Sequence, residues 1–131
     1  MSRMMRLNEE EFLVLQQYNG LLESLEEAFL YLCDNADQPA SNTAKQVKED
    51  SYLAITKIVE THVFMVDWFS DQKDALKVIT EFEGFIDELE SLGHFSAHPI
   101  KEKEVFSTYL IPAFEEWKFD MQKQLLPLLT H

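Results

Sequence analysis

The chain has 131 residues, of which 46% are hydrophobic and 12% aromatic, enough for one folded domain with a core and too much for an intrinsically disordered chain. Only 3 Gly and 4 Pro are present, so the chain lacks the turn residues that an all-β sandwich or barrel needs. The 24 acidic residues outnumber the 11 Lys and Arg, and the net charge of −13 disfavours binding to nucleic acids or to anionic membranes, because both require clustered cations. This composition predicts a mostly helical, soluble domain.

The first expected helix spans residues 8–34. Asn8 is a favourable N-cap, and Glu11 lies three residues later, which is the spacing of a capping box. Apolar residues then recur at helical spacing through the segment. The acidic residues on the other side of this helix are interpreted as a solvent-exposed face: Glu23, Glu26 and Glu27.

The second expected helix follows a polar loop at residues 34–43. Ser41 or Asn42 is its expected N-cap, and the helix runs to about Phe69. One face carries an apolar stripe at helical spacing, and His62 lies on that stripe. The histidine is therefore expected to be buried.

The third expected helix begins after a short break at residues 70–71 and ends at Gly93, a typical C-terminal cap. Its apolar residues recur in steps of three and four, which is the spacing of a helix-bundle seam. The fourth helix contains Pro112, whose ring removes one backbone hydrogen bond. We expect a kink, or two short helices meeting at Ile111 and Pro112, and we expect Pro127 to end or fray the last turn.

Four helices with short connections predict an all-α, antiparallel four-helix bundle. The chain is expected to form a single domain over residues 1–131, with residues 1–7 as a flexible N-terminal tail. The sequence contains no apolar run long enough to span a bilayer and no apolar segment typical of a signal peptide, and its single cysteine cannot form an internal disulfide. We therefore expect a cytoplasmic protein that does not bind membranes.

The sequence lacks the motifs of common catalytic and metal sites. None of the histidines has a glutamate three residues before it, so the di-iron site of helical bundles is not predicted. The three separate glycines exclude a phosphate-binding loop and a dinucleotide fingerprint. His94 and His98 have the spacing of a helical metal clip, but they lie between Gly93 and Pro99 and are interpreted as loop residues. We therefore predict no catalytic residue, no metal site and no cofactor.

The main functional hypothesis is a non-catalytic interaction or regulatory protein that binds a protein partner or a second copy of itself. Large aromatic residues that fall off the main helix seams either extend the core or form a contact surface. The candidate surface, expected to be exposed in the monomer, comprises Phe64, Trp68, Phe85 and Trp117.

His62 supports an alternative hypothesis, in which a pocket between helices binds a small ligand or a substrate. A buried neutral imidazole needs a hydrogen-bond partner, so His62 is either a structural residue or the polar group of such a pocket. This alternative predicts a concave apolar pocket with His62 in its wall.

A third hypothesis is an acidic nucleic-acid mimic, which would need its carboxylates arrayed along one face.

One segment resembles a known protein family. Residues 105–117, Val-Phe-Ser-Thr-Tyr-Leu-Ile-Pro-Ala-Phe-Glu-Glu-Trp, resemble the closing stretch of a family of small acidic all-helical proteins of Bacillus-like bacteria, and residues 58–68 and 79–92 are similar to its preceding helices. The family is uncharacterised and has no assigned catalytic residues. The resemblance therefore implies a bacterial, cytoplasmic, single-domain helical protein and transfers no site residue.

Overall fold

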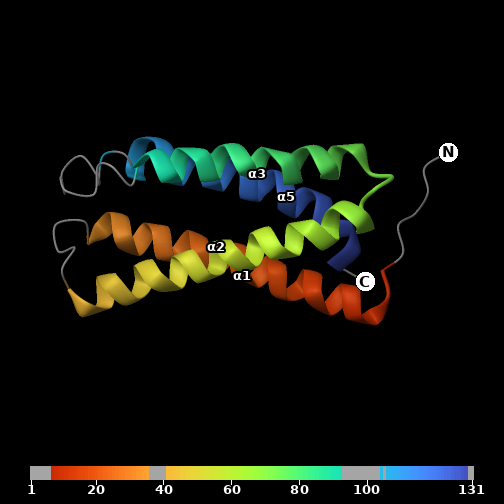
Figure 1. Cartoon of the computed structure of the whole chain (residues 1–131), viewed down its shortest axis with the longest axis horizontal. Helices are drawn as coiled ribbons and strands as arrows, with labels where there is room; N and C mark the ends of the chain where they lie inside the picture. Colours follow the sequence, from red (N-terminus) through yellow and green to blue (C-terminus); the bar gives the residue numbers. More distant parts are fainter. Residues whose placement is uncertain (1–6, 36–40, 93–103, 105, 130–131) are drawn as a thin grey trace.

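The computed structural model describes residues 7–35, 41–92, 104 and 106–129, and this part of the chain is helical. The elements are α1 (Glu9–Asp34), α2 (Asn42–Trp68), α3 (Lys73–Leu92), the short π-helix η2 (Phe106–Leu110) and α5 (Ile111–Leu129). Consecutive long helices run in opposite directions, and each packs on two neighbours in the cyclic order α1, α2, α3, α5 (Figure 1). The predicted antiparallel four-helix bundle is confirmed.

The expected N-caps of the first two helices are present. The Asn8 side chain accepts a hydrogen bond from the backbone N–H of Glu11 at 2.7 Å, and the Glu11 carboxylate accepts one from the backbone N–H of Asn8 at 3.3 Å, which completes the capping box. The Ser41 hydroxyl accepts a hydrogen bond from the backbone N–H of Ala44 at 3.1 Å, so Ser41, rather than Asn42, caps α2. Each cap satisfies a backbone donor that the first helical turn leaves unpaired.

The interruption that was expected near Pro112 is also confirmed. The π-helix η2 ends at Leu110 and runs directly into α5 at Ile111, so Pro112 lies just after the point where the helical pairing changes. Such a π turn and a proline are both typical causes of a break in regular α-helical geometry. Pro127 does not end the helix, because α5 includes this residue and continues to Leu129. Pro127 lies within the last turn of α5, and the expected fraying of that turn stays a prediction.

The centre of the bundle is built from aromatic side chains of all four long helices. The ring of Phe114 in α5 packs against Phe29 of α1 and Phe85 of α3, with a centroid distance of 5.4 Å in each case. Trp117, one turn further along α5, contacts Phe82 of α3 at 4.5 Å. These contacts hold α3 and α5 together, and Trp117 also packs on the His62 ring of α2 at 5.8 Å.

Some expectations concern residues near the edges of the described chain. Residues 1–6 of the predicted tail, the cap at Gly93 and the pair His94 and His98 lie outside the described residues. Leu7, which was assigned to the tail, is described and packs partly buried against the core.

None of the described helices is both long and apolar enough to cross a membrane.

Candidate functional site

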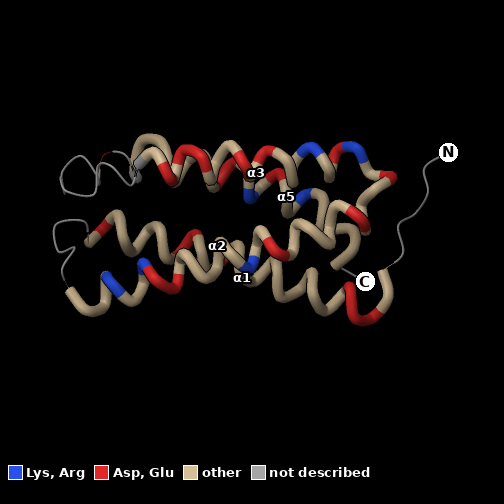
Figure 2. Tube along the Cα trace, viewed as in Figure 1, with Lys and Arg blue, Asp and Glu red and all other residues tan. Residues whose placement is uncertain are grey.

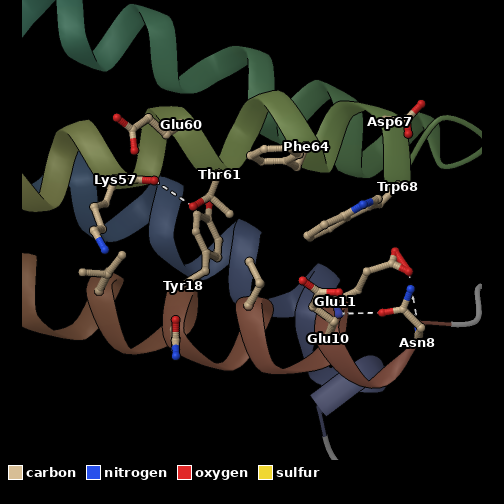
Figure 3. A pocket seen from close by; sticks show the side chains of 13 residues that line it. Asn8, Glu10, Glu11, Tyr18, Lys57, Glu60, Thr61, Phe64, Asp67 and Trp68 are labelled. Atoms are coloured by element: carbon tan, nitrogen blue, oxygen red, sulfur yellow. Dashed lines mark hydrogen bonds between the residues drawn. The ribbon is translucent and has the colours of Figure 1, made fainter.

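A hollow of about 630 Å³ lies between α1 and α2. Phe64 and Trp68, one turn apart on α2, form one wall, and their rings stack with a centroid distance of 6.2 Å and an interplanar angle of 26°. Figure 3 shows the Trp68 ring reaching from α2 toward the start of α1, where Glu10 and Glu11 lie. We call this hollow the aromatic pocket.

The aromatic pocket is strongly acidic. Its lining contains four carboxylates and one ammonium group, a formal balance of −3 (four negative charges against one positive): Glu10, Glu11, Glu60, Asp67 and Lys57 (Figure 3). A concave site lined mainly by one sign of charge concentrates ions of the opposite sign. Aromatic faces attract cations, and carboxylates form charge-assisted hydrogen bonds with them. The pocket therefore suits an organic cation, such as an arginine or lysine side chain.

A second hollow of about 440 Å³ lies on the other side of α2, between α2 and α3. Both helices contribute apolar side chains to its walls: Val59, Val63, Val66, Ile79 and Ile86. Two carboxylates of α3, Glu83 and Asp87, also line it, and the rings of His62 and Phe82 reach it from the core. We call this hollow the α2/α3 groove.

His62 is a core residue that lines the α2/α3 groove. Its Nε2 lies 2.7 Å from the hydroxyl of Tyr18, with which it forms a buried hydrogen bond, and Tyr18 in turn lines the aromatic pocket. The rings of Phe82 and Trp117 pack on the imidazole at 5.2 and 5.8 Å. A Tyr–His pair thus crosses the core from one hollow to the other.

Burial determines the protonation of this pair. Desolvation lowers the pKa of His62 from 6.5 to about 4, so the imidazole is neutral at pH 7. Desolvation also raises the pKa of Tyr18, which keeps the phenol protonated. A general base works best when its pKa lies near the working pH. His62 is therefore suited to hydrogen bonding and poorly suited to general-base catalysis.

The structure divides the four predicted surface residues into two pairs. Phe64 and Trp68 share the wall of the aromatic pocket, and Phe64 is 60% exposed. Phe85 and Trp117 are each only 5% exposed, so the prediction that they lie on an exposed surface is wrong. The reason is that α3 and α5 face each other, which places both rings in the aromatic core described above.

The match to a known family covers most of these elements. Residues 13–119 match a family described as a domain of unknown function, DUF8042. The chain belongs to the DUF8042 family. No curated protein and no solved structure matches the chain. Membership in an uncharacterised family agrees with the resemblance seen in the sequence, and the bacterial origin that the resemblance implies stays a prediction.

A polar cluster of the DUF8042 chain that sequence analysis missed joins α1 to α5. The buried ammonium of Lys118 lies 3.0 Å from a carboxylate oxygen of Glu23 and 3.2 Å from one of Glu26. Gln122 donates hydrogen bonds to Asn19 at 3.0 Å and to Glu23 at 2.8 Å. The interpretation as a solvent-exposed face holds for Glu23, whose side chain is 54% exposed, and needs correction for Glu26, whose side chain is only 22% exposed, although both bond to Lys118 across the α1–α5 interface.

The pKa values of this cluster indicate a stable ion pair. Burial opposes the charge of Lys118, but its hydrogen bonds to Glu23 and Glu26 outweigh that penalty and raise the pKa of the ammonium. Hydrogen bonds from Gln122 and Lys118 lower the pKa of Glu23. Both groups stay charged at neutral pH, so the cluster acts as a structural clamp between two helices.

Replacing Lys118 with methionine should lower the free energy of unfolding by about 1–2 kcal/mol, a value between those of exposed and buried ion pairs. Lys123→Met on the same helix is the matched control, since Lys123 lies over the exposed ring of Phe119 and should cost less than about 0.5 kcal/mol. Urea unfolding of the two variants measures the difference. Equal losses would show that the ion pair contributes nothing to stability.

In the described part of this DUF8042 chain, His, Cys, Asp and Glu residues form no group of three or more that could hold a metal ion.

Proposed function

We propose that this DUF8042 chain is a cytoplasmic, non-catalytic protein-binding module that holds a basic partner at the aromatic pocket. The observation that carries the proposal is the stacked pair of an exposed Phe64 and a partly buried Trp68 in a hollow lined by carboxylates. Large aromatic side chains in concave, partly desolvated sites are the typical anchors of protein interfaces. Trp68 packs partly buried against the core, whereas the exposed ring of Phe64 lies outside it.

The chemistry of the pocket specifies what the partner presents. An arginine side chain can lay its planar guanidinium against the Trp68 ring while its N–H groups bond to the carboxylates of Glu10 and Glu11 on α1. The net charge of −13 steers basic partners toward the chain and repels a second copy. A basic protein therefore fits the pocket better than a homodimer does.

The α2/α3 groove favours a second candidate function, the binding of a small molecule, because His62 lies in its wall as that hypothesis requires. This candidate is weaker, since the Nε2 of His62 is already bonded to Tyr18 and only one ring nitrogen remains for a ligand. Mimicry of a nucleic acid gains no support, because the carboxylates lie along all four long helices rather than in a single row (Figure 2).

Differential affinity capture tests the proposal. Phe64→Ala removes half of the aromatic wall, and Phe119→Ala is a matched control because it removes an equally large and equally exposed ring (63% against 60%) from α5, away from the pocket. We expect a basic protein that is retained by the unmodified chain and by Phe119→Ala, is lost with Phe64→Ala, and is released by moderate salt. Retention by all three chains would count against the proposal.

A further inference from the structure

The outer side of α2 carries a second apolar stripe that no helix of the described chain covers. Its members recur in steps of four and three residues, which is the heptad spacing of a helix that packs against another helix: Tyr52, Thr56, Val59, Val63 and Val66. Val63, at the centre, is 69% exposed. The stripe is separate from the buried face of α2, which contains Ile58, His62 and Met65. α2 therefore presents a packing seam without a partner.

Helix α3 supplies the opposite wall of this seam. Ile79 and Ile86 are seven residues apart and both line the α2/α3 groove, so α3 repeats the heptad spacing of α2. Figure 1 shows α2 and α3 converging toward their connection at residues 69–72 and diverging toward their other ends. The groove is lined on α2 by Val59, Val63 and Val66, and the stripe continues from there along the exposed side of α2 to Tyr52. The stripe from Tyr52 to Val66 spans 14 residue steps, which is about 21 Å of helix.

The α2/α3 groove carries negative charge on its α3 side, where Glu83 and Asp87 line it. A partner that fills the groove must bring cations to this side, and a second copy of the same chain, whose net charge is −13, would instead bring further carboxylates.

From the heptad spacing of α2 and the acidic α3 wall we infer that the α2/α3 groove docks an amphipathic α-helix from another protein. The helix presents apolar residues at heptad spacing to Val59, Val63 and Val66, and Lys or Arg on one flank to the carboxylates of Glu83 and Asp87. The short, β-branched valines of α2 leave room for a helix to approach closely, in the mode by which an amphipathic helix occupies a hydrophobic groove. This site lies on the opposite side of α2 from the aromatic pocket and does not depend on that pocket's function.

A synthetic helix tests this inference with the full chain. The probe is a labelled peptide of roughly three heptads with Leu at the two core positions and Lys at the flanking positions. We expect it to bind in a fluorescence-anisotropy titration and to become helical on binding, as measured by circular dichroism. Val63→Lys should weaken binding by about tenfold or more, because it places a charge in the middle of the apolar wall. Val63 is so exposed that this change leaves the core intact.

Matched variants separate the groove from general electrostatic attraction. Leu13→Lys adds the same charge at an exposed leucine of α1 outside both hollows, and it should leave the affinity within about twofold of the unmodified chain. Glu83→Gln should weaken binding, whereas Glu90→Gln, which removes a carboxylate of α3 outside the groove, should not. Phe64→Ala should also leave peptide binding unchanged, which distinguishes this site from the aromatic pocket.

Three results would overturn the inference. The first is equal binding of a peptide with the same composition in scrambled order. The second is an equal effect of Val63→Lys and Leu13→Lys. The third is a dimer of the unmodified chain in sedimentation equilibrium that Val63→Lys dissociates, because the groove would then be occupied by a second copy.

Discussion

Replacing Trp117 with alanine should lower the free energy of unfolding by about 3–5 kcal/mol, the range found when a large aromatic residue is removed from a packed core. The indole packs against Phe82 at 4.5 Å and Phe114 at 5.9 Å, and its Nε1 donates a buried hydrogen bond of 2.7 Å to the backbone carbonyl of Val78. Truncation removes the ring contacts and this bond together, and it leaves a cavity between α3 and α5. The loss is a large fraction of the stability of a domain of this size.

Phe119→Ala provides the comparison for Trp117→Ala on the same helix. Phe119 is two residues further along α5 and is exposed, so its replacement should change the free energy of unfolding by less than about 1 kcal/mol. Urea titrations followed by circular dichroism give both values, provided that unfolding is two-state. Similar losses for the two variants would contradict the packing of α3 on α5 through Trp117.

Local signals in the sequence were sufficient to predict the helices. The capping box at Asn8 and the cap at Ser41 depend on residues three positions apart, and the interruption at Pro112 depends on a single side chain. These features act within one turn, so they can be identified without the rest of the fold. The four-helix bundle then follows from the apolar stripes and the short connections.

The surface of the bundle was less predictable, because helical phase does not tell which flanks a neighbouring helix covers. Phe64, Trp68 and Phe85 all fall off the main seams of their helices, yet only Phe85 is buried. Phe85 lies on α3 where it faces α5, whereas Phe64 and Trp68 lie at the end of α2 that diverges from α1 and line the open hollow there (Figure 1). The angle between two helices, which depends on packing over their whole length, decides whether such a side chain is buried or exposed.

Hydrogen-bond and ion-pair partners that are distant in sequence could not be predicted either. His62 was placed correctly on the apolar stripe, but its partner Tyr18 is 44 residues away, and Lys118 is 92 residues from Glu26. No spacing rule links residues on different helices before their register is known. The sequence could therefore suggest a pocket with His62 in its wall, whereas the Tyr–His pair that joins the two hollows could be identified only in the structure.

Acidification from pH 7 to pH 4 should lower the stability of the fold by about 3 kcal/mol through His62 alone. The pKa of this group is about 4 in the folded chain and 6.5 in the absence of burial. Below pH 6.5 the unfolded chain therefore binds a proton that the folded chain cannot accept. The contribution of His62 is complete above about pH 6.5, falls as the pH decreases toward 4 and is constant below that value, with about 1.4 kcal/mol for each unit of pKa difference.

The surroundings of His62 explain why the folded state resists this proton. The rings packed on the imidazole belong to Tyr18, Phe82 and Trp117, and none of them carries a charge at neutral pH. The carboxylates of Glu83 and Asp87 line the same groove. Burial sets the direction of the pKa shift, because desolvation penalises the charged imidazolium.

His62→Gln isolates this effect, since glutamine does not titrate and can still bond to the Tyr18 hydroxyl. Other groups titrate in the same range, among them Glu23, whose lowered pKa also makes the fold less stable in acid. Subtracting the variant's free energy of unfolding from that of the unmodified chain at each pH cancels these shared contributions. The remaining difference should fall by about 3 kcal/mol between pH 7 and pH 4. Parallel curves for the two chains would show that the imidazole accepts a proton equally well in both states, which is incompatible with its burial between Tyr18, Phe82 and Trp117.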